Sequence, residues 1–200
     1  MIPLSVPNIS GNEWEYVKDC LNTGWISSAG EYVNKFEESV KSYTGSKYAV
    51  ACMNGTVGLH ISLKLAGVND NDIVIAPNLT FVATLNAISY TGAQIILVDA
   101  CKDTWQLDVY LLEKWLIKHS EISIVDGKPI TIEKSTGKRI GAIMPVYVLG
   151  GCVNINKLLK ISRTYGIPLV EDSTEALGSL QNGKHAGTYG LTGVLSFNGN

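Results

Sequence analysis

Short apolar runs that alternate with helical segments fill the chain from Lys47 onward, and this alternation constrains its fold more than any other feature. The apolar runs predict strands at 48–52, 73–76, 95–98, 141–148 and 168–170. Segments with apolar residues at helical spacing lie between them, at 56–66, 81–90, 109–119 and 155–165. Continuous apolar strands that alternate with helices are typical of a parallel sheet covered on both faces. The sequence therefore predicts a three-layer α/β fold with a mostly parallel sheet flanked by helices.

The first 45 residues carry a different pattern, which predicts two helices. Ser10 and Glu13 have the spacing of a capping box, and an apolar stripe at helical spacing follows them. A second amphipathic helix stops at Gly45 and has its stripe at Val33, Phe36, Val40 and Tyr43. We expect an N-terminal helical segment over 1–45 and a large domain over 46–200.

Residues 121–139 depart from the alternation and predict a β-hairpin inserted between a helix and a strand. Two β-prone runs, 122–125 and 130–132, flank the turn-forming sequence Asp-Gly-Lys-Pro. Two interpretations stay open for this insert: a decoration of the surface, or a loop that sets substrate specificity.

Composition excludes several classes of function. Sixteen Lys plus Arg residues against eighteen Asp plus Glu give a net charge of −2, which argues against a nucleic-acid-binding protein. No apolar stretch reaches the roughly 18–20 residues of a transmembrane helix, and the N-terminus lacks a signal-peptide pattern, so we expect a cytoplasmic protein without membrane contact. The four cysteines lack C-x-x-C spacing and the three histidines are isolated, so we expect reduced core thiols and no metal site.

One segment after an expected strand has the chemistry of a phosphate site. Asn54, Gly55 and Thr56 follow the run 48–52 and open a helix, so backbone amides and the Thr56 hydroxyl are available to an anion. The same residues also make an ordinary turn followed by a helix cap. Neither a G-x-G-x-x-G fingerprint nor a P-loop pattern occurs in the chain.

Three further segments place suggestive side chains where strands end, the usual ligand edge of a parallel sheet. Phe81 opens a helix and suits either a planar ring or the core. The acids of 171–175 end an apolar strand and suit either a cationic ring nitrogen or solvent. Ser196 ends the last strand and offers a second hydroxyl to a phosphate.

Taken in order, these segments resemble the DegT/StrS-type sugar aminotransferases of the fold-type-I, aspartate-aminotransferase-like superfamily. The resemblance covers nearly all of the chain and rests on seven motifs: G-W-I-S-S-A-G at 24–30, N-G-T at 54–56, T-F-V-A-T-L-N-A-I at 80–88, P-V-Y at 145–147, E-D at 171–172, A-L-G at 176–178 and S-F at 196–197. It implies the large domain of PLP fold type I, which stops before the family's C-terminal small domain, and pyridoxal 5′-phosphate as the cofactor.

The resemblance assigns roles to five of the candidate residues. Gly55, Thr56 and Ser196 would hold the cofactor phosphate. Phe81 would stack on the pyridine ring, and Asp172 would pair with the ring nitrogen.

Three positions depart from the family pattern. Glu175 stands where the family often has Gln, and would lie near the phenolic oxygen of the cofactor, where a carboxylate repels a phenolate unless one of them is protonated. Tyr147 stands where many members have His, at a weak substrate contact. The lysine that forms the Schiff base is expected immediately after Asn200, so no catalytic residue lies within the chain.

The activity implied by the resemblance is transamination from glutamate to a nucleotide-linked keto-sugar. The insert and the acidic run look most like members that act on 4-keto-6-deoxy sugars of the bacillosamine and legionaminic acid pathways, and family members are generally homodimers. A pyridoxamine-phosphate-dependent sugar dehydratase, in which His replaces the lysine, is the first alternative. A non-catalytic regulatory relative is the second, and a nicotinamide-dependent dehydrogenase is a distant third because the glycine fingerprint is missing.

Overall fold

The computed structural model describes residues 6–198, and the chain divides into two compact units. One comprises Met1–Ala51 with Phe197–Asn200, and the other comprises Cys52–Ser196. The sequence instead predicts a boundary between 45 and 46. Residues 1–5 and 199–200 lie outside the described residues. The expected lack of a leader and the expected approach to the lysine depend on these residues.

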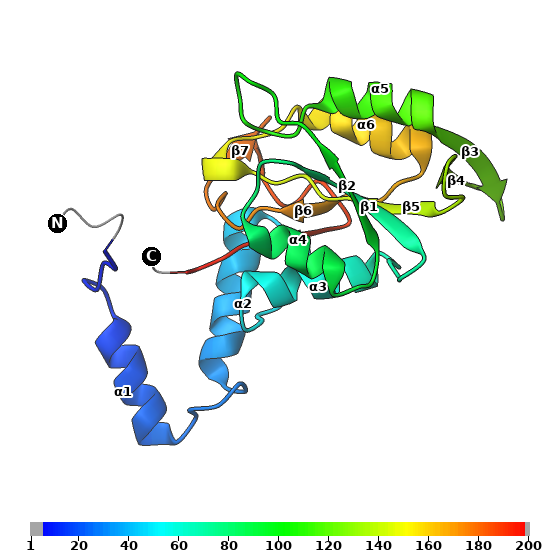
Figure 1. Ribbon diagram of the computed structural model, residues 1–200. Coiled ribbons are helices and arrows are strands. Elements are labelled where there is room, and N and C mark those ends of the chain that lie inside the picture. The colour runs from blue at the N-terminus through cyan, green and yellow to red at the C-terminus, as the bar shows by residue number, and fades with distance from the viewer. Residues whose placement is uncertain (1–5, 199–200) are drawn as a thin grey trace. The chain divides into compact units, whose positions relative to one another are not determined.

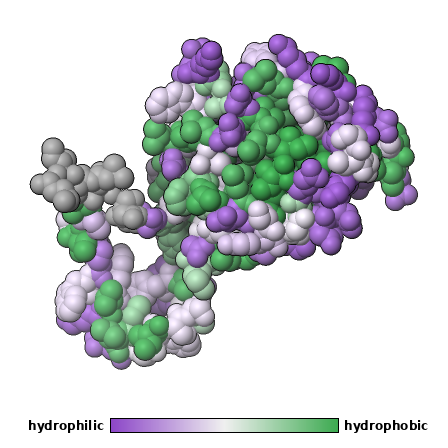
Figure 2. All heavy atoms as spheres, in the orientation of Figure 1, coloured by the Kyte–Doolittle hydropathy of each residue, from purple (hydrophilic) through white to green (hydrophobic). Residues whose placement is uncertain are grey.

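The first unit contains helices α1 (Glu13–Thr23) and α2 (Glu31–Thr44), each followed by a glycine in the left-handed conformation. The predicted capping box is wrong, because the N-cap is Asn12 and the Glu13 carboxylate accepts the Gly11 amide at 2.9 Å. The predicted strand at 48–52 is also wrong: no strand forms there, and the Ala51 amide donates to Glu37. No residue of α1 is buried, and Figure 2 shows apolar side chains on the surface of this unit.

The second unit is built on a five-stranded sheet with the order β2-β1-β5-β4-β3. Strand β1 (Asp72–Pro77) pairs in parallel with β2 (Gln94–Val98) on one side and with β5 (Arg139–Ile143) on the other. Strand β6 (Val170–Asp172) pairs in parallel with β9 (Thr192–Val194). Single bridges from Ile143 to Leu169 and from Val146 to Asp172 join β5 to β6, so β2, β1, β5, β6 and β9 point the same way.

Helices cover both faces of this sheet, as Figure 1 shows. Helices α5 (Val109–His119) and α6 (Ile155–Tyr165) pack on one face, where Ile73, Ile75 and Ile143 meet Leu112 and Leu158 in one buried cluster. Helices α3 (Gly55–Leu65) and α4 (Val82–Ser89) pack on the other, where a second cluster contains Val74, Ala76, Ala142, Leu59 and Ala87. Alternate residues of β1 thus enter opposite cores, as the period of two requires. The expected three-layer α/β fold is confirmed.

Two predicted strands are displaced along the chain. Of the run 141–148, only residues up to Ile143 belong to β5, and the last residue, Val148, begins the one-turn helix η1 (Val148–Gly150). The run 168–170 contributes only its last residue to β6, which continues through Glu171 and Asp172. The two carboxylates therefore lie within the strand rather than after it.

The predicted hairpin is confirmed as β3 (Ser120–Val125) and β4 (Lys128–Glu133), with Asp126 and Gly127 both at positive φ in its turn. It is not a surface decoration, because β4 pairs with β5 and the Thr131 hydroxyl donates to the Tyr165 carbonyl at the end of α6. The end of α6 lies beside the amino ends of the parallel strands, so the hairpin is at the opposite end of the unit from the ligand edge (Figure 1). This placement does not favour a specificity loop.

The remaining strands, β7 (Leu180–Gln181) and β8 (Lys184–His185), form a small antiparallel pair. All four cysteines are free. Cys152 packs against the buried core cluster, but Cys20 and Cys101 are only half-buried and Cys52 is exposed, so the expected placement in the core is wrong for these three. Among the helices of residues 6–198, none is long and apolar enough to cross a bilayer. Over the same residues, no three His, Cys, Asp or Glu side chains gather as a possible metal site.

Candidate active site at the carboxyl ends of the strands

Four of the predicted segments meet at one edge of the second unit. Asp172 is the last residue of β6, and Ser196 follows β9 by two residues. Gly55 is the first residue of α3, and Phe81 is the N-cap of α4. Since parallel strands end at the same edge of a sheet, the fold collects these residues there.

The start of α3 adjoins both the acidic segment and Ser196. A Cβ atom added to Gly55 would lie 3.0 Å from the Thr174 methyl group and 3.8 Å from the Ser196 Cβ atom. The Asn54 side chain caps the helix by accepting the Val57 amide at 2.9 Å. The amides of the first helical residues, Gly55 and Thr56, have no possible partner within the helix and carry its positive dipole end. A glycine that leaves this space, with two hydroxyl-bearing residues beside it, suits a phosphate group.

The Asp172 carboxylate is buried, with the residue 3% exposed, and neutral donors hold both of its oxygens. Oδ2 accepts the Thr84 hydroxyl at 2.6 Å, and Oδ1 accepts the Thr174 hydroxyl at 2.7 Å and the Thr174 amide at 3.3 Å. None of the ion pairs within residues 6–198 involves Asp172. A buried carboxylate without a cationic partner is costly, so this group suits a cationic ligand.

Thr84 and Thr174 lie within the motif at 80–88 and the acidic run 171–175, but the sequence assigns neither of them a role in the site. Thr84 lies 88 residues from Asp172 in the chain, and only the packing of α4 against the sheet joins them. A local signal does exist for Thr174, because an Asp followed two residues later by Thr is typical of a side-chain-capped turn.

Phe81 is 73% exposed, so the interpretation that it belongs to the core is wrong. Its backbone is extended, with φ −67° and ψ 143°, and α4 begins at the next residue. An aromatic side chain this exposed, at the ligand edge of the sheet, is available to stack on a planar ring.

Glu171 points to the other face of β6 and is completely buried. Its carboxylate accepts the Tyr147 hydroxyl at 2.5 Å and the amides of Gly187, Tyr189 and Gly190. Of the acids in 171–175, Glu171 and Asp172 are therefore not solvated.

Tyr147 lies in the core at 1% exposure, where its hydroxyl holds Glu171. Burial, followed by the charge of Glu171, raises the pKa of Tyr147 far above its ordinary value. The expected substrate contact at Tyr147 needs correction, because this side chain is enclosed and already committed to Glu171.

Glu175 is exposed and holds the backbone of the loop after β5. Its carboxylate accepts the Leu149 amide at 2.6 Å, and Leu149 has a left-handed φ of 53°. The Ser179 hydroxyl donates to the Gly150 carbonyl at 2.8 Å and supports the same turn. A position of Glu175 beside a cofactor oxygen stays a prediction.

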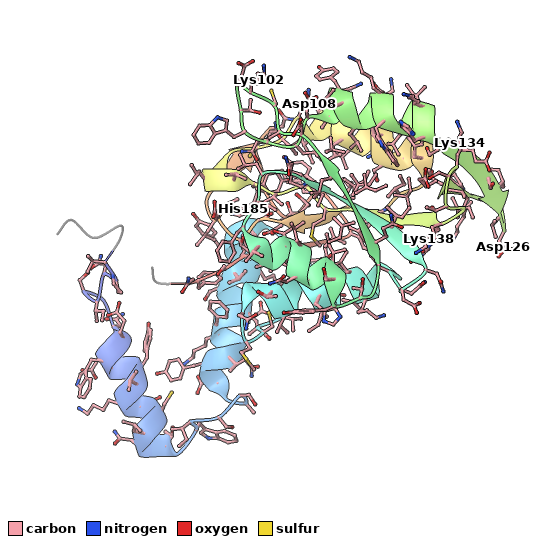
Figure 3. All side chains as sticks on the ribbon, in the orientation of Figure 1. Lys102, Asp108, Asp126, Lys134, Lys138 and His185 are labelled. Atoms are coloured by element: carbon pink, nitrogen blue, oxygen red, sulfur yellow. The ribbon has the colours of Figure 1, made fainter. Side chains whose placement is uncertain are left out.

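His185, labelled in Figure 3, is buried, and both of its ring nitrogens contact the backbone. Nε2 accepts the Gly178 amide at 2.8 Å, and Nδ1 lies 2.5 Å from the Ala186 carbonyl oxygen. A nitrogen that accepts an amide carries no proton, so Nδ1 is the protonated nitrogen. His185 thus has a structural role in the β7–β8 segment.

The comparison with protein families agrees with this geometry. The sequence profile of the DegT/DnrJ/EryC1/StrS aminotransferase family matches residues 7–200. The chain belongs to this family. The resemblance noted from the sequence motifs is thereby confirmed.

Known members of the family are similar to this chain over its whole length. GDP-perosamine synthase of Escherichia coli O157:H7 is 36% identical over 199 residues, which cover 100% of this chain and 49% of that protein. The PLP form of Spr1654 from Streptococcus pneumoniae has a TM-score of 0.79 at 27% identity, over 99% of this chain and 49% of that one. GDP-4-keto-6-deoxymannose-3-dehydratase (ColD) with bound GDP-perosamine has a TM-score of 0.78 at 25% identity, over 96% and 46%. This chain therefore spans about half the length of the curated relatives that it matches.

Proposed function

We propose that the full-length protein is a pyridoxal-phosphate-dependent aminotransferase that transfers an amino group from glutamate to a nucleotide-linked 4-keto-6-deoxy sugar. The observation that carries this proposal is the buried Asp172 carboxylate, held by neutral donors and lacking a cation among residues 6–198. An ionised carboxylate in that setting favours a protonated pyridine nitrogen.

The described residues fit this cofactor, and each has a proposed task. Gly55, Thr56 and Ser196 would hold the phosphate at the start of α3. Phe81 would stack on the ring, and Asp172 would keep a proton on the ring nitrogen. When bound, pyridoxal phosphate supplies an electron sink for the amino-group transfer.

Two further contacts belong to the proposal. Glu175 would lie near the phenolic oxygen of the cofactor. A lysine next to Asn200 in the full-length protein anchors the cofactor and moves protons.

The relatives support the class of sugar. The name GDP-perosamine synthase and the ligand of the ColD structure both describe GDP-linked deoxysugars. These names favour a GDP-linked 4-keto-6-deoxy sugar over the bacillosamine and legionaminic acid substrates suggested by the sequence. A homodimer in the cytoplasm is part of the same proposal, and the exposed apolar side chains of α1 are compatible with a protein interface.

A sugar dehydratase that uses pyridoxamine phosphate is the second candidate, because the fold matches the ColD dehydratase as well as it matches Spr1654. A regulatory relative without catalysis is the third.

Borohydride reduction separates these candidates. Full-length protein is incubated with pyridoxal phosphate, reduced, digested and analysed by mass spectrometry. An aminotransferase gains a reduced cofactor adduct on one lysine, whereas a dehydratase or a regulatory relative does not. Absence of the adduct refutes the proposed activity.

A coupled assay then tests the substrates. Full-length protein, glutamate and a panel of GDP-, UDP- and dTDP-linked 4-keto-6-deoxy sugars are mixed, and 2-oxoglutarate is measured. We expect turnover with at least one GDP-linked sugar. Reduced adduct without 2-oxoglutarate from any sugar refutes the substrate class alone.

A further inference from the structure

Three threonines surround Asp172 and form one connected set of contacts, here called the threonine relay: Thr80, Thr84 and Thr174. The Thr80 and Thr84 hydroxyl oxygens are 2.6 Å apart, Thr84 donates to Asp172 Oδ2 at 2.6 Å, and Thr174 donates to Oδ1 at 2.7 Å. Thr84 is completely buried. The sequence alone assigns none of these threonines a role in the site.

The hydrogen-bond directions within the relay follow from the carboxylate of Asp172. An ionised carboxylate only accepts hydrogen bonds, so Thr84 must give its single proton to Asp172. The Thr80 hydroxyl has two acceptors within reach, the Thr84 hydroxyl at 2.6 Å and the Phe81 carbonyl oxygen at 3.1 Å. Because the proton of Thr84 goes to Asp172, the shorter contact needs the proton of Thr80. The hydroxyl protons of Thr80 and Thr84 thus both point toward Asp172, and they orient its carboxylate through Oδ2.

The relay also connects the other groups proposed to hold the cofactor. Phe81 lies between Thr80 and Thr84 in the sequence and is 73% exposed, so little side-chain packing holds it in place. At the other end, the Thr174 methyl group lies 3.0 Å from where a Cβ atom on Gly55 would stand. The relay thus joins the start of α4, the end of β6 and the start of α3.

We propose that Thr84 is the central positioning residue of this site: through the relay it sets the distance between the ring-stacking Phe81, the nitrogen partner Asp172 and the phosphate-binding start of α3. This inference rests on the proposed function, because those three groups act on pyridoxal phosphate. Thr84 does not touch the reacting atoms, and it acts through Asp172 and Phe81.

The test compares Thr84→Val with Thr84→Ser in the full-length protein. Valine has nearly the same shape as threonine but lacks the hydroxyl, so it leaves Asp172 Oδ2 without its buried donor. We expect Thr84→Val to weaken the equilibrium binding of pyridoxal phosphate about tenfold. It should also shift the pH dependence of the bound cofactor's visible absorption. Thr84→Ser keeps the hydroxyl and should bind within about threefold of wild type.

Thr91→Val is the matched control. Thr91 is buried like Thr84, but its hydroxyl donates to the Ile88 carbonyl at the end of α4 and not to Asp172. It should change thermal stability without changing cofactor affinity or absorption. Thr80→Val, at a half-buried position, tests the outer link and should weaken binding about threefold if Thr84→Val does not fold.

Three outcomes decide the matter. Weaker binding by both valine variants, with rescue by serine, supports the relay. If Thr84→Val binds pyridoxal phosphate with wild-type affinity and its absorption titration is unchanged, the inference is overturned while the proposed function stands. If Thr84→Val is unfolded, the same result in Thr80→Val overturns it. Failure of the wild-type protein to bind pyridoxal phosphate refutes the proposed function, and the inference with it.

Discussion

Replacing Glu171 by glutamine should destabilise the segment that leads into β9, by an amount that the geometry of the carboxylate sets. Oε1 accepts the amides of Tyr189 and Gly190 at 2.7 and 2.5 Å, and Oε2 accepts the Tyr147 hydroxyl at 2.5 Å and the Gly187 amide at 3.0 Å. A glutamine keeps only one oxygen, so its NH₂ group must face one of these pairs.

The less costly orientation turns the NH₂ group toward Tyr147 and Gly187. The tyrosine hydroxyl rotates and accepts from it, but the Gly187 amide loses its acceptor inside the protein. One buried donor without a partner costs about 1–3 kcal/mol. The remaining bonds lose the strength that the negative charge gave them, which adds about 1 kcal/mol. We therefore expect Glu171→Gln to lower the free energy of unfolding by about 3 kcal/mol.

Urea unfolding of the full-length protein, followed by circular dichroism at neutral pH, measures the total loss. Hydrogen exchange with mass spectrometry locates it, because the amides of 187–190 should exchange faster than in wild type. Glu121→Gln, at an exposed position of β3, is the control and should change neither. Equal unfolding midpoints for Glu171→Gln and Glu121→Gln, or unchanged exchange over 187–190, would refute the reasoning.

Other predictions concern the opposite end of the unit. Gly166→Ala should lower the free energy of unfolding by at least about 3 kcal/mol, because its Cβ would lie 2.0 Å from the Pro129 carbonyl oxygen at a φ of 63°. Gly137→Ala, with a φ of 69° and open space around the added Cβ, should lower it by about 1 kcal/mol. Thermal unfolding of the two variants checks the difference. Arg139→Met should cost about 3 kcal/mol in urea unfolding, because it removes the 2.6 Å ion pair from the buried Asp72 carboxylate. Burial would raise the pKa of Glu133, but hydrogen bonds from Ser135 and Thr136 outweigh it and lower the pKa from 4.5 to about 2. The carboxylate therefore stabilises the fold by about 2 kcal/mol above about pH 5, and this contribution disappears as the pH falls toward 2. The free energy of unfolding of Glu133→Gln should therefore be lower than that of wild type at pH 7, and the two should converge at low pH.

The sequence predicts helices α5 and α6 to the residue because each has a clear local start. The Asp108 side chain accepts the amides of Tyr110 and Leu111, and the Asn154 side chain accepts the Lys157 amide. The apolar spacing then continues without interruption to the end of each helix. Side-chain caps and periodicity are local properties, so a single sequence contains them.

Strands are less predictable, because a strand also needs a neighbour that the local sequence does not specify. The run 48–52 has strand composition, yet it forms no strand, and its Ala51 amide bonds to a glutamate side chain instead. The same limit explains why β6 extends past its apolar residues through Glu171 and Asp172. The ladder with β9 determines where β6 ends, and hydrophobicity does not.

The site divides in the same way between local and distant information. Gly55 and Phe81 could be found because each lies at the start of a helix, and Asp172 because it lies at the end of a strand. Thr84 could not be found, because its contact with Asp172 exists only after α4 has packed on the sheet. The enclosure of Tyr147 is also invisible locally, since its partner Glu171 lies 24 residues away.

The two adjacent carboxylates of β6 lie in opposite surroundings. Side chains alternate across a strand, so Glu171 and Asp172 enter opposite faces of the sheet although they are neighbours in the chain. Glu171 meets a tyrosine hydroxyl and three backbone amides, a set that satisfies an anion and leaves no place for a ligand. Asp172 meets two hydroxyls and one long amide contact, which orient the carboxylate while leaving capacity to accept a further donor. Exchanging the residues, as Glu171→Asp with Asp172→Glu, conserves the charge but moves each carboxylate by about one methylene. The double variant should lose both the bonds that hold 187–190 and the affinity for pyridoxal phosphate, whereas retention of either would show that charge alone, without this placement, is sufficient.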